Sequence, residues 1–159
     1  MTRADIVKIV VALVLPQLAG VIGSIFTASA VPDWYSTLIR PELAPPNWVF
    51  APVWTMLFIL MGIAAFLIWR KGLQTKGVLF ALVLFGVQLI LNTLWSVVFF
   101  GFRNTALAFI EIGLLWLAIA ATLVAFSRIS RTAAVLLVPY ILWVSFAAYL
   151  NYQFWALNG

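Results

Sequence analysis

The chain has 159 residues, of which 66% are hydrophobic and only 8% charged, and its formal net charge is +5. Soluble domains are about 45–50% apolar and about 25% charged, and a chain of this size cannot bury so much apolar surface in a core of its own. The composition therefore excludes an ordinary soluble fold and predicts one integral membrane domain over residues 1–159.

Five apolar windows, free or nearly free of interior charge, follow one another along the chain. Each has the roughly 20 residues that a helix needs to cross the hydrocarbon core of a bilayer. They lack the strict alternation of a membrane β-barrel, and lipid leaves no partner for unpaired backbone groups. The predicted fold class is an all-α integral membrane bundle of five transmembrane helices, at about 6–27, 49–69, 78–100, 105–126 and 133–157.

The connection after the first predicted helix, about 28–48, is much longer than the others. With the start of the next helix it reads RPELAPPNWVFAPVW from Arg40 to Trp54, which holds four of the seven prolines. Proline lacks an N–H and fixes φ, so this run is neither a regular helix nor a central strand. A long loop in a small protein is more often functional than idle. We therefore expect a stiff lid that includes Arg40, Pro41, Pro45, Pro46 and Trp48.

Aromatic and amide side chains gather at one depth on three of the predicted helices, in the half next to this loop. Their spacings of three, four and seven residues place them on one face of each helix. These residues are Trp54 and Phe58 on the second helix, Gln88, Asn92 and Trp95 on the third, and Trp143, Ala147 and Asn151 on the fifth. The pattern predicts a pocket beneath the loop.

Each of these features also has a purely structural interpretation. Trp48 and Trp155 fit the belt of aromatic residues at a membrane surface. Gln88 and Asn92 fit hydrogen bonds that only join neighbouring helices. Glu111 is the one acid inside a predicted span, which makes it a candidate functional residue by default, but partial hydration near the helix end explains it equally well.

The chain contains no cysteine and no histidine, and only four acidic residues. These absences exclude disulfides, nucleophilic catalysis by Cys or a Ser-His pair, and ligation of a metal or haem by Cys or His. Three of the acids lie outside the predicted spans, so no pair of carboxylates is available within the membrane. We expect no catalytic residue and no metal site, and we expect that the protein requires no cofactor.

Three stretches together resemble the translocator protein family, also known as tryptophan-rich sensory proteins. They are WYSTLIRPELAPPNWVFAPVWTMLF, QLILNTLWSVVFFG and VPYILWVSFAAYLN, and the match extends from Gly20 to Asn158. The resemblance implies a five-helix bundle that binds tetrapyrroles such as protoporphyrin IX and haem, isoquinoline or benzodiazepine drugs, and sterols. It also implies a homodimer that pairs through the third helix, where Ala81 and Gly86 lie.

The resemblance further implies which residues line the family's ligand pocket. They are Tyr35 in the loop, with Trp54, Phe58, Asn92, Trp95, Trp143 and Ala147 on the helices. In the family the first loop covers the pocket, and stiff prolines reduce the conformational entropy lost when a ligand is enclosed. Two positions depart from the family pattern. Leu43 stands where a Trp is common, and no Lys or Arg follows Tyr152, so sterol binding by the family's cholesterol motif is not supported.

We therefore expect a membrane protein that binds tetrapyrroles as a sensor, scavenger or regulator, with membrane lipids and a second copy as its other partners. One alternative is a transporter of porphyrin or lipid. Another is a light-dependent porphyrin-degrading activity, for which Tyr35 and Trp143 occupy the positions implicated in the family. Nucleic-acid binding is not expected, because the basic residues follow the topology of a membrane protein.

Seven of the nine basic residues lie on one side of the predicted five-helix zigzag, and only Arg40 and Arg103 lie on the other. The positive-inside rule places the seven in the cytoplasm, together with the N-terminus and the connections at 70–77 and 127–132. We expect a bacterial membrane protein with its long loop and its C-terminus outside.

Single thiols introduced into this cysteine-free chain test the orientation. The thiol of Ser36→Cys, in the long loop, should react with an impermeant maleimide from the periplasmic side, whereas that of Gln74→Cys should not. Mass spectrometry of the intact protein measures the modification. The reverse pattern would contradict the orientation.

Overall fold

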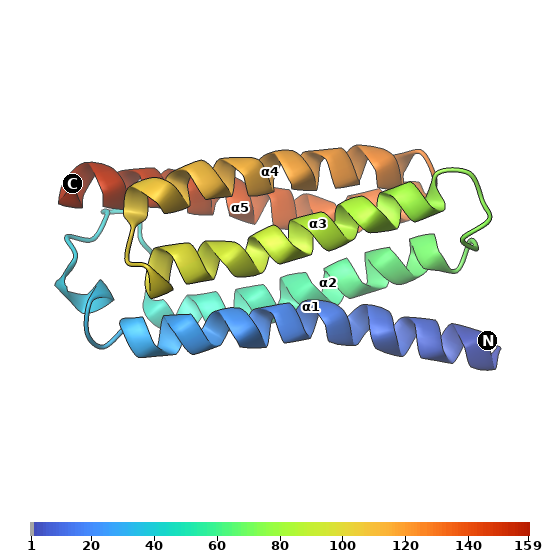
Figure 1. Cartoon of the computed structure of the whole chain (residues 1–159), viewed down its shortest axis with the longest axis horizontal. Helices are drawn as coiled ribbons and strands as arrows, with labels where there is room; N and C mark the ends of the chain where they lie inside the picture. Colours follow the sequence, from blue (N-terminus) through green and yellow to red (C-terminus); the bar gives the residue numbers. More distant parts are fainter. Residues whose placement is uncertain (1) are drawn as a thin grey trace.

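The computed structural model describes residues 2–159 as a bundle of helices that run side by side along one long axis (Figure 1). The helices are α1 Arg3–Ala30, α2 Phe50–Trp69, α3 Val78–Ser96, α4 Thr105–Ser127 and α5 Arg131–Asn158. Each is long and apolar enough to cross a membrane, and the described residues form no strand. The predicted class, an all-α bundle of five membrane helices, is confirmed.

Helices α1 and α5 begin before the predicted windows, because their N-terminal ends are capped. The hydroxyl oxygen of Thr2 accepts a hydrogen bond from the Asp5 amide at 3.2 Å, and the Asp5 carboxylate accepts one from the Thr2 amide at 3.0 Å. At the start of α5 the Ser130 hydroxyl accepts from the Ala133 amide at 3.4 Å. Such caps satisfy amides that have no partner within the helix. A charge keeps a residue out of the bilayer core, but it does not end a helix.

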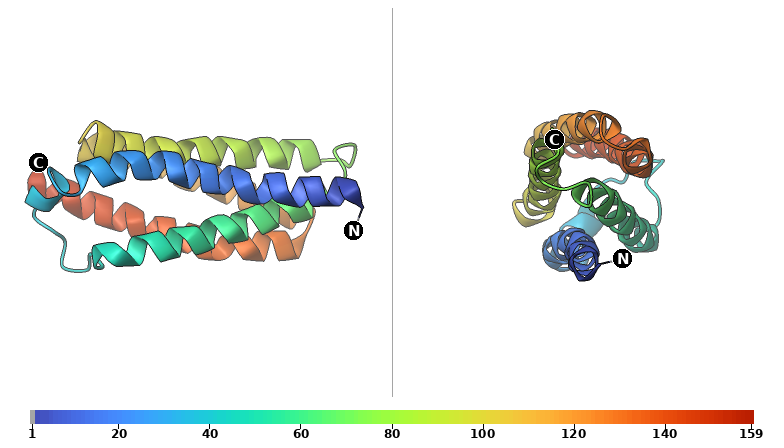
Figure 2. Two further views of the ribbon diagram at one scale, coloured as in Figure 1. Left: turned by 90° about the horizontal axis from the view of Figure 1, so that it is seen from below. Right: turned by 90° about the vertical axis from the view of Figure 1, so that its right-hand side faces the viewer.

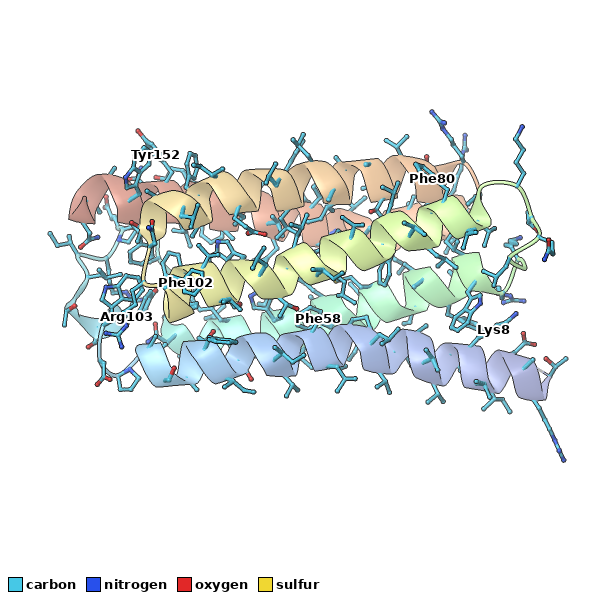
Figure 3. All side chains as sticks on the ribbon, viewed as in Figure 1. Lys8, Phe58, Phe80, Phe102, Arg103 and Tyr152 are labelled. Atoms are coloured by element: carbon cyan, nitrogen blue, oxygen red, sulfur yellow. The ribbon has the colours of Figure 1, made fainter. Side chains whose placement is uncertain are left out.

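The long connection spans residues 31–49 and contains two short 3₁₀ turns, η1 Tyr35–Thr37 and η2 Asn47–Val49. It lies at the same end of the bundle as the C-terminus, which we call the loop end, and the N-terminus lies at the opposite end (Figure 1). In Figure 3, Lys8 lies toward the N-terminal end, and Arg103 and Tyr152 lie toward the loop end. The orientation of these ends in a membrane stays a prediction.

The five helices form a closed ring in the order α1, α2, α5, α4, α3, as the end view in Figure 2 shows. Helix α2 therefore packs on α5, which is the last helix in the chain. In the half of the bundle that is farthest from the loop end, large side chains fill the space inside the ring. Phe85 of α3 stacks on Phe126 of α4 with ring centroids 6.0 Å apart, and Met61 and Ile68 of α2 are fully buried.

Helices α1 and α2 approach most closely at Gly62. A Cβ atom at this position would lie 2.7 Å from the carbonyl oxygen of Ala12 and 2.9 Å from the Cα of Leu13, so the two backbones are in direct contact. One to two turns nearer the loop end, the ring of Phe58 occupies the space that a side chain at Gly20 would need. Beyond this point α1 and α2 separate toward the loop end (Figure 2).

The two small residues expected at a dimer interface differ in their surroundings. Ala81 is fully buried inside the bundle, so it is not available to a second copy of the chain. Gly86 has no atom within 4 Å of the place where a Cβ would stand, so its backbone is open to a neighbour. The homodimer itself stays a prediction, with Gly86 as the small residue of α3 that a partner can reach.

We predict that Gly62→Ala lowers the stability of the bundle, because the added methyl group must push α1 away from α2. Overpacking of this kind costs ~1–3 kcal/mol. Thermal unfolding in mild detergent, followed by circular dichroism, measures the change. Gly113→Ala on α4 is the matched control, because no atom lies within 4 Å of its Cβ position. Equal unfolding temperatures for the two variants would contradict the close contact at Gly62.

Candidate functional site

A cavity of about 430 Å³ lies in the loop-end half of the bundle, bounded by residues of all five helices and by the long loop. This volume is within the range of small-molecule sites in proteins, roughly 300–1,000 Å³. Most of the wall is apolar or aromatic. Among its residues are Tyr35, Trp54, Phe58, Asn92, Trp95, Ile112, Leu115, Trp143, Ala147 and Asn151.

Stacked rings form the walls of the cavity. Trp54 stacks on Phe58 with centroids 5.4 Å apart, and Phe58 lies near the middle of the bundle's length (Figure 3). Trp95 stacks on Phe99 at 5.1 Å, and Trp143 meets the edge of Phe50 at 5.9 Å. Because each ring is held by another, the walls are preorganised for a flat, apolar ligand.

The amide of Asn151 fixes one of these walls. Its Oδ1 accepts a hydrogen bond from Trp95 Nε1 at 2.9 Å, and its Nδ2 donates to the carbonyl oxygen of Thr105 at 2.7 Å. Asn151 is completely buried and joins α3, α4 and α5. It therefore orients the Trp95 ring, and its amide is already occupied by these two bonds.

A second set of hydrogen bonds runs from the cavity into the core. Asn92 Nδ2 donates to the Tyr140 hydroxyl at 3.0 Å, and this hydroxyl donates to Gln88 Oε1 at 2.8 Å. Only Asn92 of the three lines the cavity, and its Oδ1 receives no hydrogen bond from the described residues. Gln88, which the sequence placed with the pocket residues, is buried one helical turn deeper on α3.

Three buried polar side chains in this half have an atom without a hydrogen-bond partner among the described residues. Trp143 Nε1, which belongs to a residue of the cavity wall, is such a donor. Both carboxyl oxygens of Glu111 and the Nε2 of Gln88 are also unpaired, but these residues lie outside the cavity wall. An unpaired buried donor costs roughly 1–3 kcal/mol, so the indole N–H of Trp143 favours a ligand that carries an acceptor.

Tyr35 brings the long loop to the cavity. It is 7% exposed, and its ring packs against Phe100 and Phe154 with centroids 5.8 and 5.3 Å apart. The guanidinium of Arg40 lies 5.7 Å from the centre of the Tyr35 ring, within the range of a cation–π contact. Burial raises the pKa of the Tyr35 hydroxyl, and the nearby positive charge of Arg40 opposes this only in part. The phenol therefore stays neutral at physiological pH.

The residues expected to form a lid lie over the loop end, but none of them belongs to the cavity wall. Arg40 donates from Nη2 to the Pro45 carbonyl oxygen at 2.9 Å, which closes the proline turn on itself. Pro41 is buried, whereas Trp48 is 75% exposed. Pro46 is also exposed and precedes η2. The residues of the long connection that line the cavity are Val31, Tyr35 and Asn47.

Asn158, at the end of α5, fastens the loop to the bundle. Its Oδ1 accepts from the Ile39 amide at 2.8 Å, and its Nδ2 donates to the Ile39 carbonyl oxygen at 3.1 Å. The same Nδ2 donates to the Phe154 carbonyl oxygen at 2.9 Å. Sequence reasoning missed both Asn158 and Tyr140. For Tyr140 a signal exists, because it lies one turn before Trp143 and Val144 on α5, whereas nothing in the sequence pairs Asn158 with Ile39.

Comparison with known proteins gives one consistent result. Residues 12–156 match the sequence model of the TspO/MBR family. The chain is 45% identical over 139 residues to the Tryptophan-rich protein TspO of Chlorobaculum tepidum, which covers 87% of this chain and 88% of that protein. It is 41% identical over 126 residues to the Tryptophan-rich sensory protein of Cereibacter sphaeroides (79% and 77%). It is 39% identical over 144 residues to the human Translocator protein (90% and 85%).

We predict that Asn158→Ala releases the loop at Ile39, because both backbone groups of Ile39 lose their side-chain partner. Hydrogen–deuterium exchange should show faster exchange across residues 36–46, while the helices keep their protection. Gln153→Ala on the same helix is the control, since no hydrogen bond of its side chain occurs among the described residues. Unchanged exchange at Ile39 in Asn158→Ala would show that other contacts hold the loop.

Proposed function

The chain belongs to the TspO/MBR family, and we propose that it is a membrane receptor for tetrapyrroles, which acts as a sensor, scavenger or regulator. One observation carries the proposal. Three tryptophans, Trp54, Trp95 and Trp143, stand on three different helices around one preformed cavity beneath the long loop. Isoquinoline and benzodiazepine drugs, which are flat and aromatic, suit the same walls.

The chemistry of a porphyrin matches these walls. Its faces are flat and apolar, and stacking on an aromatic ring contributes about 0.5–1.5 kcal/mol per pair beyond the area that is buried. Its pyrrole nitrogens and side groups supply acceptors for Trp143 Nε1, which has no partner among the described residues. Asn92 contributes a further polar group at the wall.

The acidic edge of a porphyrin determines its orientation in the cavity. Burying a carboxylate away from a partner is costly, so the propionates belong at the end of the cavity nearest water. In this structure that end is the loop end, where Tyr35 and Arg40 lie. Arg40 is exposed and can pair with a propionate while its aliphatic stem stays over the loop.

The iron of haem gains no strong ligand in this site. The chain has no histidine or cysteine, and the tyrosine at the cavity, Tyr35, keeps its proton because burial raises its pKa. A phenolate is the form that ligates haem iron in proteins that use tyrosine. We therefore expect metal-free protoporphyrin IX to bind about as tightly as haem, with no resident cofactor required.

Titration of the protein in lipid nanodiscs with protoporphyrin IX, followed by Soret absorbance, tests the proposal. Trp143→Phe removes the unpaired N–H and part of one wall, and Trp54→Ala removes the ring stacked on Phe58, so each should weaken binding several-fold. Trp69→Phe is the control, because Trp69 ends α2 at the opposite end of the bundle. If Trp69→Phe weakens binding as much as Trp143→Phe, the cavity is not the site.

The same protein in sealed vesicles separates a receptor from the two alternatives. A receptor saturates at one porphyrin per site, in the dark and in light. Steady accumulation inside the vesicles would identify a transporter. Light-dependent loss of more than one equivalent of porphyrin would identify a degrading activity.

A further inference from the structure

The cavity borders the seam between α1 and α2. The two helices touch at Gly62 and are still joined one to two turns later, where Phe58 packs on Gly20. Nearer the loop end they diverge (Figure 2). In this region the seam between α1 and α2 faces outward, toward the lipid of a membrane.

Four residues on this seam belong to the cavity wall. They are Val21 and Ser24 on α1 and Ala51 and Thr55 on α2, and we call them the side opening. All four are exposed, and Val21 is 57% exposed. At the side opening, residues of the cavity wall are therefore exposed between α1 and α2.

A groove on the outer surface continues from the side opening toward the middle of the bundle. Its volume is about 420 Å³, and its wall consists of Leu13, Val14, Gln17, Leu18, Val21 and Ile59. Gln17 and Val21 line both this groove and the cavity. The groove and the cavity are thus neighbours, outside and inside the ring of helices, with Gln17 and Val21 between them.

The polar groups along this path are turned away from it. The Ser24 hydroxyl donates to the Val21 carbonyl oxygen at 2.7 Å, and the Thr55 hydroxyl donates to the Ala51 carbonyl oxygen at 2.9 Å. Gln17 Nε2 on α1 lies 3.5 Å from the carbonyl oxygen of Thr55 on α2, which is the limit of a hydrogen bond. With the two hydroxyls bound to their own helices, the path presents mainly apolar surface.

We propose that the groove and the side opening bind one acyl chain of a membrane lipid, with the end of the chain inside the cavity. The occupant follows from the surroundings, because a surface between two membrane helices is covered by hydrocarbon chains. A flexible, unbranched chain fits an apolar groove that lies beside a cavity. This lipid site does not depend on the proposed function, and a lipid chain in it occupies part of the space available to any other ligand.

A phospholipid that carries a maleimide at the end of one acyl chain tests the proposal. The protein is reconstituted in vesicles that contain this lipid, and mass spectrometry measures modification of single introduced thiols. Ala147→Cys places a thiol in the cavity wall on α5, so it should be modified. Leu142→Cys, at a position 64% exposed on the same helix, is the positive control, and Ala108→Cys, at a position 0% exposed, is the negative one.

Two blocking substitutions identify the route. Val21→Trp and Ser24→Phe each place a large ring in the side opening, and each should slow modification of Ala147→Cys several-fold without changing that of Leu142→Cys. Ile25→Trp is the matched control, because Ile25 is 63% exposed on α1 and lines neither the groove nor the cavity. The proposal is overturned if Ala147→Cys reacts no faster than Ala108→Cys. It is also overturned if both blocking substitutions leave the reaction at Ala147→Cys unchanged.

Discussion

The backbone contact between α1 and α2 at Gly62 governs how space is distributed in this bundle. Apolar side chains gain nothing by leaving lipid tails, so membrane helices associate through close packing and hydrogen bonds. Glycine permits the closest packing, and at Gly62 the backbones of the two helices touch. Two helices that touch at one point and cross at an angle must separate elsewhere. Here they separate toward the loop end, and the cavity occupies the space between them and their neighbours.

Hydrogen bonds between side chains hold the open half together. In lipid no water replaces a missing partner, so a polar side chain is stabilised by a partner within the protein. Asn151 finds such partners by joining three helices, and Tyr140 finds them by bridging Asn92 and Gln88. These bonds keep the walls apart at a fixed separation where no side chain fills the middle. The cavity can therefore persist without a ligand.

Much of this arrangement is predictable from the sequence, for identifiable reasons. The lengths of the apolar runs predicted the five helices, and the order of three motifs predicted the family, which the comparisons confirm. Depth and helical periodicity selected residues such as Trp54, Asn92 and Trp143, which the structure places around the cavity. Periodicity gives only the angle of a side chain about its own helix. It does not say which helix stands opposite.

Where the structure departs from the sequence-based expectation, the position of a side chain depends on contacts that periodicity does not give. Gln88 shares a helical face with Asn92, but it lies one turn deeper, where its side-chain oxygen accepts a hydrogen bond from the Tyr140 hydroxyl of α5. Asn158 contacts Ile39 only because the last helix ends beside the first loop. The proline turn closes through a bond from Arg40 to Pro45, so its stiff residues sit above the cavity and leave Tyr35 to reach it. The outcomes for Gln88 and Asn158 follow from contacts between elements that are distant in the chain, whereas the bond from Arg40 to Pro45 is local.

The ring order also has a consequence for biogenesis. Helices enter the membrane in the order of synthesis, and N-terminal segments are available to fold first. Helix α1 can pair with α2 and then with α3 as each emerges, but α2 keeps an unpaired face until α5 arrives to pack between it and α4. The ring closes only after the last helix is inserted, and the residues that complete the cavity, Trp143 and Asn151, are on that helix. A nascent chain that stops before α5 therefore lacks this cavity, which is complete only once α5 has been inserted.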